Sequence, residues 1–163
     1  MPTPNAASDA STKPVEREVV ITRIFDAPRS LVFKMWTDPK HLVQWWGPKS
    51  FTNSVCEVDA HVGGKWRIVM RAPNGEEYPG GGVYREIVEP ERLAFTNNAI
   101  DKDGNTILEG LTTVTLVEVG RQTKLTLQTR AVAVVPYAAA YLAGMEAGWT
   151  QSLERLAEHL ARG

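Results

Sequence analysis

The stretch PYAAAYLAGMEAGWTQSLERLAEHLAR, at residues 136–162, decides the fold that the rest of the chain supports. Its large apolar residues recur at steps of three and four, which places them on one face of an α-helix. Pro136 suits the first turn of a helix, because the N–H that proline lacks would have no partner there. We therefore predict one long helix over residues 136–162. Its apolar face consists of Tyr141, Met145, Trp149, Leu153, Leu156 and Leu160.

The two halves of this helix differ in the residues that surround the apolar face. After Trp149 these residues are mostly charged, as at Glu154, Arg155 and Glu158, whereas before it they are small or apolar and Glu146 is the only charge. A helix that is apolar nearly all round is usually covered on more than one side. We therefore expect the second half to lie on a surface and the first half to be enclosed or to border a cavity.

Length and composition favour a single domain without a membrane span. The chain has 163 residues, a net charge of −1 and one cysteine. This charge argues against nucleic acid or a membrane as the main partner, and no apolar run is long enough to cross a bilayer. Cys56 cannot form an internal disulfide, which fits a reducing, cytoplasmic location. Residues 1–14 are rich in Pro, Ala, Ser and Thr and are predicted to be a disordered tail, and residues 15–163 to be the domain.

The remaining segments predict an antiparallel sheet. Alternating apolar residues predict strands at 17–25, 51–59, 65–71, 82–88, 93–97, 107–119 and 123–134. Helical spacing predicts short helices at 28–36, with Asp26 as the N-cap, and at 39–46. Consecutive strands joined by short turns form a meander, and only the C-terminal helix is long enough to cover one face of it. The sequence thus predicts an α+β fold, in which a curved seven-stranded sheet encloses a cavity against the first half of that helix.

Five motifs carry a family resemblance. They are FDAP at 25–28, WWGP at 45–48, GGKWR at 63–67, YREIVEPERL at 84–93 and the GW pair at 148–149. In this order and spacing, over about residues 18–160, the chain resembles the family named after the activator of the heat-shock protein 90 ATPase. That family belongs to the START-related, birch-pollen-allergen-like (SRPBCC) superfamily. The resemblance implies a helix-grip fold with an internal cavity, a fold that hosts carriers, cyclases, hydrolases and co-chaperones.

The candidate ligand-binding residues are those expected on the inner face of the sheet and on the helices. Core packing is the alternative role for each of them. Trp45 and Trp46 illustrate both roles, because adjacent residues on a helix point about 100° apart. One of the two can pack its helix against the sheet while the other lines the cavity. The candidates are Trp46, Phe51, Trp66, Ile68, Met70, Tyr84, Glu86, Phe95, Leu116, Leu127, Thr129, Tyr141, Met145 and Trp149.

Glu86 is the only catalytic candidate, and a weak one. It alternates with Tyr84 and Val88, so on the inner face its carboxyl group would enter an apolar cavity, its pKa would rise, and it could act as an acid or base. The alternative is an outward Glu86, solvated or paired with an arginine. Glu146, the lone charge on the apolar half of the long helix, either guards the mouth of the cavity or points to water.

The sequence predicts neither a metal site nor a cofactor. His41, His61 and His159 lie far apart in the sequence and none has a ligand-spaced partner. We therefore expect a non-enzymatic domain that binds a small, mostly hydrophobic molecule. The alternatives are a co-chaperone-like domain that activates a chaperone ATPase, and an enzyme similar to polyketide cyclases or hydrolases. An exposed strand edge leaves both a monomer and a homodimer open.

Overall fold

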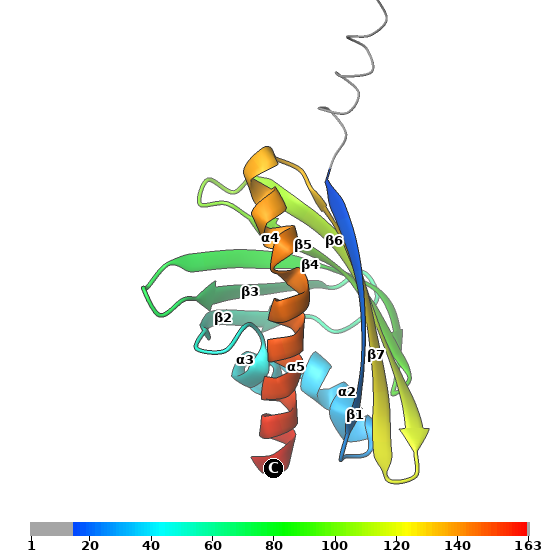
Figure 1. Cartoon of the computed structure of the whole chain (residues 1–163). Coiled ribbons are helices and arrows are strands. Elements are labelled where there is room, and N and C mark those ends of the chain that lie inside the picture. The colour runs from blue at the N-terminus through cyan, green and yellow to red at the C-terminus, as the bar shows by residue number, and fades with distance from the viewer. Residues whose placement is uncertain (1–14, 163) are drawn as a thin grey trace, which may run out of the picture.

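Seven antiparallel strands form one strongly curved sheet, and the C-terminal helical segment lies across its concave face (Figure 1). The computed structural model describes residues 15–162, and the predicted tail at 1–14 lies outside them. The strands are β1 (Glu16–Phe25), β2 (Thr52–Val58), β3 (Lys65–Arg71), β4 (Glu77–Val88), β5 (Arg92–Ile100), β6 (Thr106–Val119) and β7 (Gln122–Ala133). The helices are α2 (Arg29–Thr37), α3 (Pro39–Trp45), a 3₁₀ turn (Pro136–Ala138), α4 (Ala139–Ala143) and α5 (Met145–Arg162). The predicted α+β architecture and element order are confirmed.

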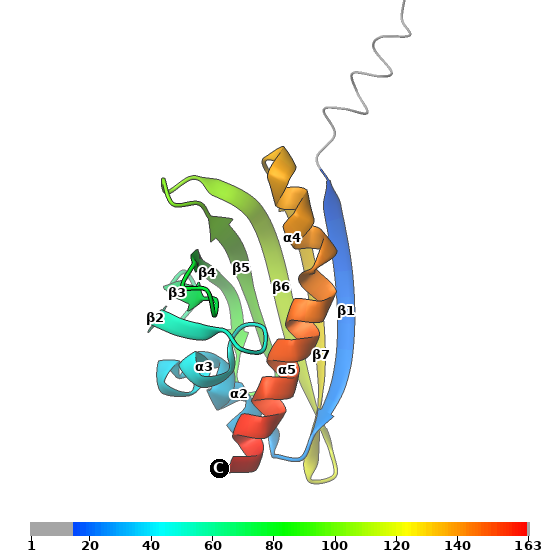
Figure 2. The same cartoon turned by 60° about the vertical axis from the view of Figure 1, so that its left-hand side comes forward.

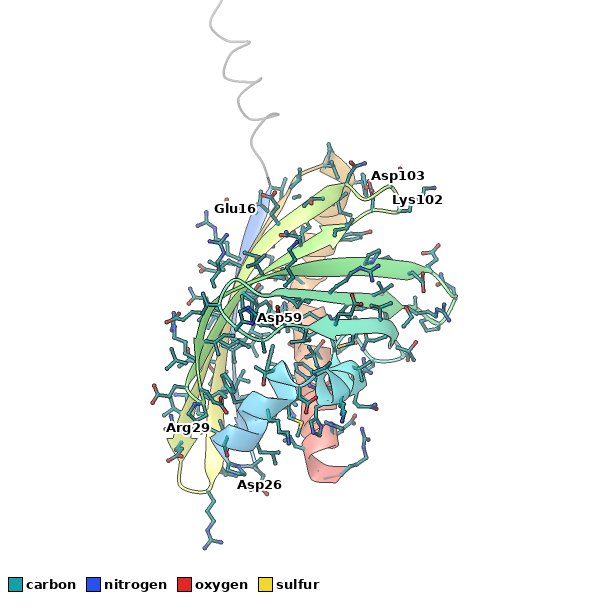
Figure 3. The ribbon with its side chains drawn as sticks, turned by 180° about the vertical axis from the view of Figure 1, so that it is seen from behind. Glu16, Asp26, Arg29, Asp59, Lys102 and Asp103 are labelled. Atoms are coloured by element: carbon teal, nitrogen blue, oxygen red, sulfur yellow. The ribbon has the colours of Figure 1, made fainter. Side chains whose placement is uncertain are left out.

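The sheet has the order β1-β7-β6-β5-β4-β3-β2, so strands β2 to β7 form the predicted meander and β1 pairs with β7. Helices α2 and α3 cover the same concave face at the end where the chain terminates (Figure 2). Seen from behind, Asp26 and Arg29 lie at that end, whereas Lys102 and Asp103 of the β5–β6 turn lie at the other end, with α4 (Figure 3). The two ends therefore differ: α2, α3 and α5 close one of them, and, among residues 15–162, the 3₁₀ turn and α4 cover the other.

The core fills the end that α2, α3 and α5 cover. Trp149, Leu153 and Leu156 of α5 are buried there, as the helical spacing predicted. The ring of Trp36 stacks on that of Trp149 with centroids 6.1 Å apart, and Trp45 is fully buried. Aromatic side chains pack from three elements, so this end of the molecule leaves little space for a ligand.

The C-terminal helix is interrupted, and the prediction of one continuous helix is wrong. Helix α4 ends at Ala143, and α5 begins after Gly144, a residue type with low helix propensity. Arg17 of β1 donates hydrogen bonds from Nη1 to the carbonyls of Leu142 and Ala143, at 3.0 and 3.1 Å. These bonds satisfy carbonyls that the interruption releases. Because of the break, Tyr141 does not lie on the buried face of α5, and this residue is 39% exposed.

The starts of α2 and β4 also differ from the prediction. Helix α2 begins after Pro28, which is extended and makes no side-chain cap, so Asp26 is not the N-cap. Strand β4 begins at Glu77, five residues before the predicted start, and includes three consecutive glycines. A Cβ at Gly82 would lie 1.9 Å from the carbonyl oxygen of Thr96. The glycines therefore allow β4 to approach β5 closely within the sheet, whereas the predicted strand included only the last of them, Gly82.

A histidine pair links α3 to α5, and we expect it to make stability depend on pH. His41 Nδ1 lies 3.0 Å from His159 Nε2, and burial, then His41 and Arg162, lower the pKa of His159 below its usual value. The unfolded chain then binds more protons than the folded chain in acid. We expect the free energy of unfolding to fall as the pH drops below about 6.5 and to level off below the folded-state pKa.

Urea unfolding at about pH 7.5 and about pH 5.5 measures this dependence. The variant His159→Gln should lose this part of the pH dependence and keep the rest. A variant with the same dependence as the natural chain would show that the pair does not contribute.

Candidate functional site

A cavity of about 440 Å³ lies between the concave face of the sheet and α4. It occupies the half of the molecule that carries α4 and the β5–β6 turn, away from the aromatic core. This is the place that the small residues before Trp149 predicted. Its lining comes from the α3–β2 connection, strands β3 to β6, helix α4 and Gly144 after it. The lining residues are Trp46, Pro48, Phe51, Trp66, Ile68, Met70, Tyr78, Pro79, Gly80, Asn97, Asn98, Ala99, Leu108, Ala140, Tyr141 and Gly144.

The inner wall of the cavity is aromatic. The rings of Trp46 and Trp66 lie 5.3 Å apart, inclined by 60°. Trp66 Nε1 donates to the carbonyl of Thr96 at 2.9 Å, which fixes the ring against β5. Behind this pair a void of about 10 Å³ touches Tyr84 and Phe95, and burial raises the pKa of Tyr84 above its usual range. The two tryptophans thus separate the cavity from the core.

The WWGP motif positions Trp46 by linking the loop after α3 to α5. Gly47 has a φ of +100°, and a Cβ there would lie 2.9 Å from Met70 Sδ. Its N–H donates to Ser152 Oγ at 3.1 Å. Arg155 Nη1 donates to the carbonyls of Trp46 and Gly47 at 2.9 and 3.0 Å. The motif therefore holds Trp46 at the cavity while the preceding residue, Trp45, stays in the core.

The opposite wall is α4, where Ala140 and Gly144 leave the space that larger side chains would fill. Glu146, just beyond, accepts a hydrogen bond from Arg17 Nη2 at 3.0 Å. Arg17 therefore holds both the end of α4 and the start of α5. The only sequence signal for this contact was the lone carboxylate on an apolar stretch, because its partner lies on the first strand.

Uncharged residues line the whole cavity. Among residues 15–162, the side chains that contact it include no Asp, Glu, His, Lys or Arg. The polar side-chain groups are the amide of Asn97 and the hydroxyls of Tyr78 and Tyr141. Asn98 alternates with Asn97 along β5 and also borders a hollow on the outer face with Thr96 and Arg85, so its amide points away from the cavity. Tyr78 donates to Glu76 Oε2 at 2.9 Å, and this hydrogen bond raises the pKa of Tyr78. The site can therefore accommodate apolar surface and orient a few uncharged polar groups.

The structure brings together some of the sequence-predicted residues and separates others. Six of them lie in the lining: Trp46, Phe51, Trp66, Ile68, Met70 and Tyr141. Others are part of the packed core or of a buried polar cluster: Tyr84, Phe95, Leu116, Leu127, Thr129 and Trp149. Met145 is partly buried and packs against the core beside the cavity. The shared inner face is thus divided into a packed part and an open part.

Glu86 lies on the outer face, so its interpretation as an acid or base inside the cavity is wrong. The register between β4 and β5 shifts between Tyr84 and Glu86, which leaves Arg85 as an extra residue. Such a bulge reverses the alternation of side chains, and Ile87 instead of Glu86 follows Tyr84 on the inner face. Glu86 Oε1 accepts a hydrogen bond from Arg92 Nε at 2.6 Å. The arginine-paired alternative describes this residue correctly.

Several lining residues were not among the named candidates, half of them because β4 begins before and β5 ends after the predicted bounds. They are Pro48, Tyr78, Pro79, Gly80, Asn97, Asn98, Ala99, Leu108, Ala140 and Gly144. The alternation within TNNAI at 96–100 was the available signal, but two asparagines masked it, since Asn is uncommon in strands.

Two wider observations concern metals and membranes. Within residues 15–162, no three His, Cys, Asp or Glu side chains form a group suited to a metal ion. In the same part of the chain, none of the helices combines the length and the apolar character that a membrane crossing requires.

The chain is similar to one known protein family in sequence and to several solved structures in fold. The model of the family described as Activator of Hsp90 ATPase homolog 1-like protein matches residues 26–161. A crystal structure of a Chromobacterium violaceum protein is 30% identical, with 86% of this chain and 94% of that one covered and a TM-score of 0.73. No functionally curated protein matches the sequence.

Two further solved structures are each 25% identical to this chain. The AHSA1 protein from Silicibacter pomeroyi has a TM-score of 0.76, with 89% of this chain and 98% of that one covered. A solution structure of an Arthrobacter aurescens protein has a TM-score of 0.78, with 93% and 92% covered.

Proposed function

We propose that this chain, which belongs to the Activator of Hsp90 ATPase homolog 1-like family, binds one small, uncharged, mostly apolar molecule in the cavity beside α4. The observation that carries the proposal is the cavity itself, about 440 Å³ in volume and lined without a charged side chain among residues 15–162. Ligand pockets of about 300–1,000 Å³ with apolar and aromatic walls are typical of small-molecule sites. Met70 in the lining adds a flexible side chain that adapts to differently shaped ligands.

The absence of charge among the described lining residues restricts the ligand. A carboxylate or ammonium group that entered the cavity would lose its hydration and would find no ion-pair partner there. An uncharged molecule avoids this cost and gains from the burial of apolar surface against Trp46 and Trp66. The proposal therefore favours neutral aromatic or alicyclic molecules over fatty acids and other anions.

Thermal unfolding with a panel of matched neutral and anionic aromatic molecules tests the proposal. A neutral ligand at 100 times its Kd should stabilise the folded state by about 2.7 kcal/mol, which raises the Tm of a domain of this size by roughly 5–10 °C. The matched carboxylates should have little effect. If neither class shifts the Tm, and native mass spectrometry finds no small molecule in the purified protein, the proposal is wrong.

Interaction with a chaperone is the second candidate, and the convex face of the sheet favours it. Exposed aliphatic side chains, Val20, Leu111 and Val117, lie there among charged residues, and Arg130 pairs with Glu16 at 2.6 Å. Stimulation of the ATPase of the cognate heat-shock protein 90 would support this candidate. A lack of both binding and stimulation would remove it without affecting the ligand proposal, because the two use opposite faces of the sheet.

A further inference from the structure

A buried polar cluster lies at the edge of the otherwise apolar cavity. Its three side chains, Asn97 of β5, Thr112 of β6 and Thr129 of β7, lie side by side on the inner face of three neighbouring strands. Thr112 and Thr129 are fully buried, and only Asn97 lines the cavity. Burying a hydroxyl group costs free energy unless the group is hydrogen-bonded. The two threonine hydroxyls therefore need hydrogen-bond partners within the cluster.

The three side chains form a chain of short hydrogen bonds. Thr112 Oγ1 lies 2.7 Å from Asn97 Oδ1 and 2.8 Å from Thr129 Oγ1. Asn97 pairs with Gly110 across the strands, and a Cβ at Gly110 would lie 3.0 Å from Asn97 Oδ1 and 3.1 Å from Nδ2. The amide therefore lies over the glycine, with limited freedom to turn.

The direction of these bonds determines which end of the amide faces the cavity. Each threonine has one hydroxyl proton. If Thr129 donates to Thr112 and Thr112 donates to Asn97 Oδ1, both protons are used. If the amide were turned round, the contact between the two hydroxyls could use only one proton, and the other would have no acceptor in the cluster. The arrangement that satisfies both buried hydroxyls directs Oδ1 toward Thr112, which does not line the cavity, and leaves the NH₂ group as the free end.

We propose that Asn97 is the residue that determines ligand specificity, and that its NH₂ group donates a hydrogen bond to a carbonyl-type acceptor on the ligand. Within residues 15–162, no group accepts a hydrogen bond from Asn97 Nδ2, so both of its N–H donors are available. Thr112 and Thr129 act as positioning residues, which hold the amide in this orientation. This inference rests on the proposed function and narrows the ligand class to neutral apolar molecules with a ketone, ester, lactone or quinone oxygen.

A pair of matched probes tests the inference. The first is the naphthalene ketone prodan, a neutral molecule whose fluorescence reports hydrogen bonding to its carbonyl group. The second is its propyl analogue, in which a methylene group replaces the carbonyl. The ratio of their affinities isolates the hydrogen bond, because both molecules present almost the same apolar surface.

The variant Asn97→Leu keeps the branched shape of the side chain, with the same number of heavy atoms, and removes the donor. It should lower the ketone-to-propyl affinity ratio by about fivefold, which corresponds to the net free-energy contribution of one neutral hydrogen bond. The emission of bound prodan should also shift to the blue. The control Asn98→Leu changes the neighbouring amide, whose position alternates with that of Asn97 along β5, and should leave the ratio unchanged.

The variant Thr112→Val provides a second measurement should Asn97→Leu fold poorly, since it releases the amide and should lower the ratio by a smaller factor. An unchanged ratio in both variants, or a ratio that Asn98→Leu lowers equally, overturns the role of Asn97 and leaves the proposed function standing. If the natural chain binds neither probe, both the inference and the proposed function are overturned for this ligand class.

Discussion

Replacing Trp45 with alanine is expected to lower the free energy of unfolding by about 3–5 kcal/mol. The indole is fully buried and packs edge-on against Trp36 with centroids 4.7 Å apart. Its Nε1 donates to the carbonyl of Met35 at 3.0 Å, which joins α3 to α2. The alanine variant would lose this contact surface and leave a cavity that rigid strands on one side cannot fill. Urea unfolding followed by circular dichroism measures the loss.

The variant Trp45→Phe separates packing from hydrogen bonding. It keeps an aromatic ring but leaves the Met35 carbonyl without its donor, so it should cost about 1–3 kcal/mol. A loss below about 1 kcal/mol for Trp45→Ala would contradict the packing of α3 against the sheet.

The WWGP motif shows how far the sequence could predict this part of the molecule. Helical geometry required Trp45 and Trp46 to point in different directions, so one core and one cavity residue were expected. Which residue takes which role depends on how α3 lies on the sheet. That placement is set by long-range contacts, in particular the bonds from Arg155 and Ser152 of α5 to the loop at Gly47.

The break at Gly144 could not be predicted for the same reason. A glycine within a helix costs only about 1 kcal/mol relative to alanine, so the local sequence permits a continuous helix. The interruption is supported by Arg17, which is 125 residues away from Leu142 in the sequence. Glu86 is a comparable case, because a single bulge between β4 and β5 decides its face. The element order was predictable from local patterns, whereas the local orientation of side chains at the site was not.

Ala140→Trp is expected to weaken ligand binding by roughly 100-fold or more, the largest functional effect of the variants considered. Ala140 projects from α4 toward the cavity and is itself exposed, so a tryptophan there can occupy space that the ligand needs. Its indole would cover the Trp46 and Trp66 wall in place of the ligand. The free energy of unfolding should change by only about 0.5 kcal/mol, since Ala140 is not part of the packed core.

Ala143→Trp provides the matched control, because Ala143 is exposed on the same short helix but does not line the cavity. Titration of both variants with prodan should show near-natural affinity for Ala143→Trp and almost no binding for Ala140→Trp. Equal affinities in the two variants would mean that the ligand lies elsewhere. The prediction therefore tests the location of the site separately from the chemistry of Asn97. A tryptophan at position 140 should weaken the binding of the ketone and of its propyl analogue equally.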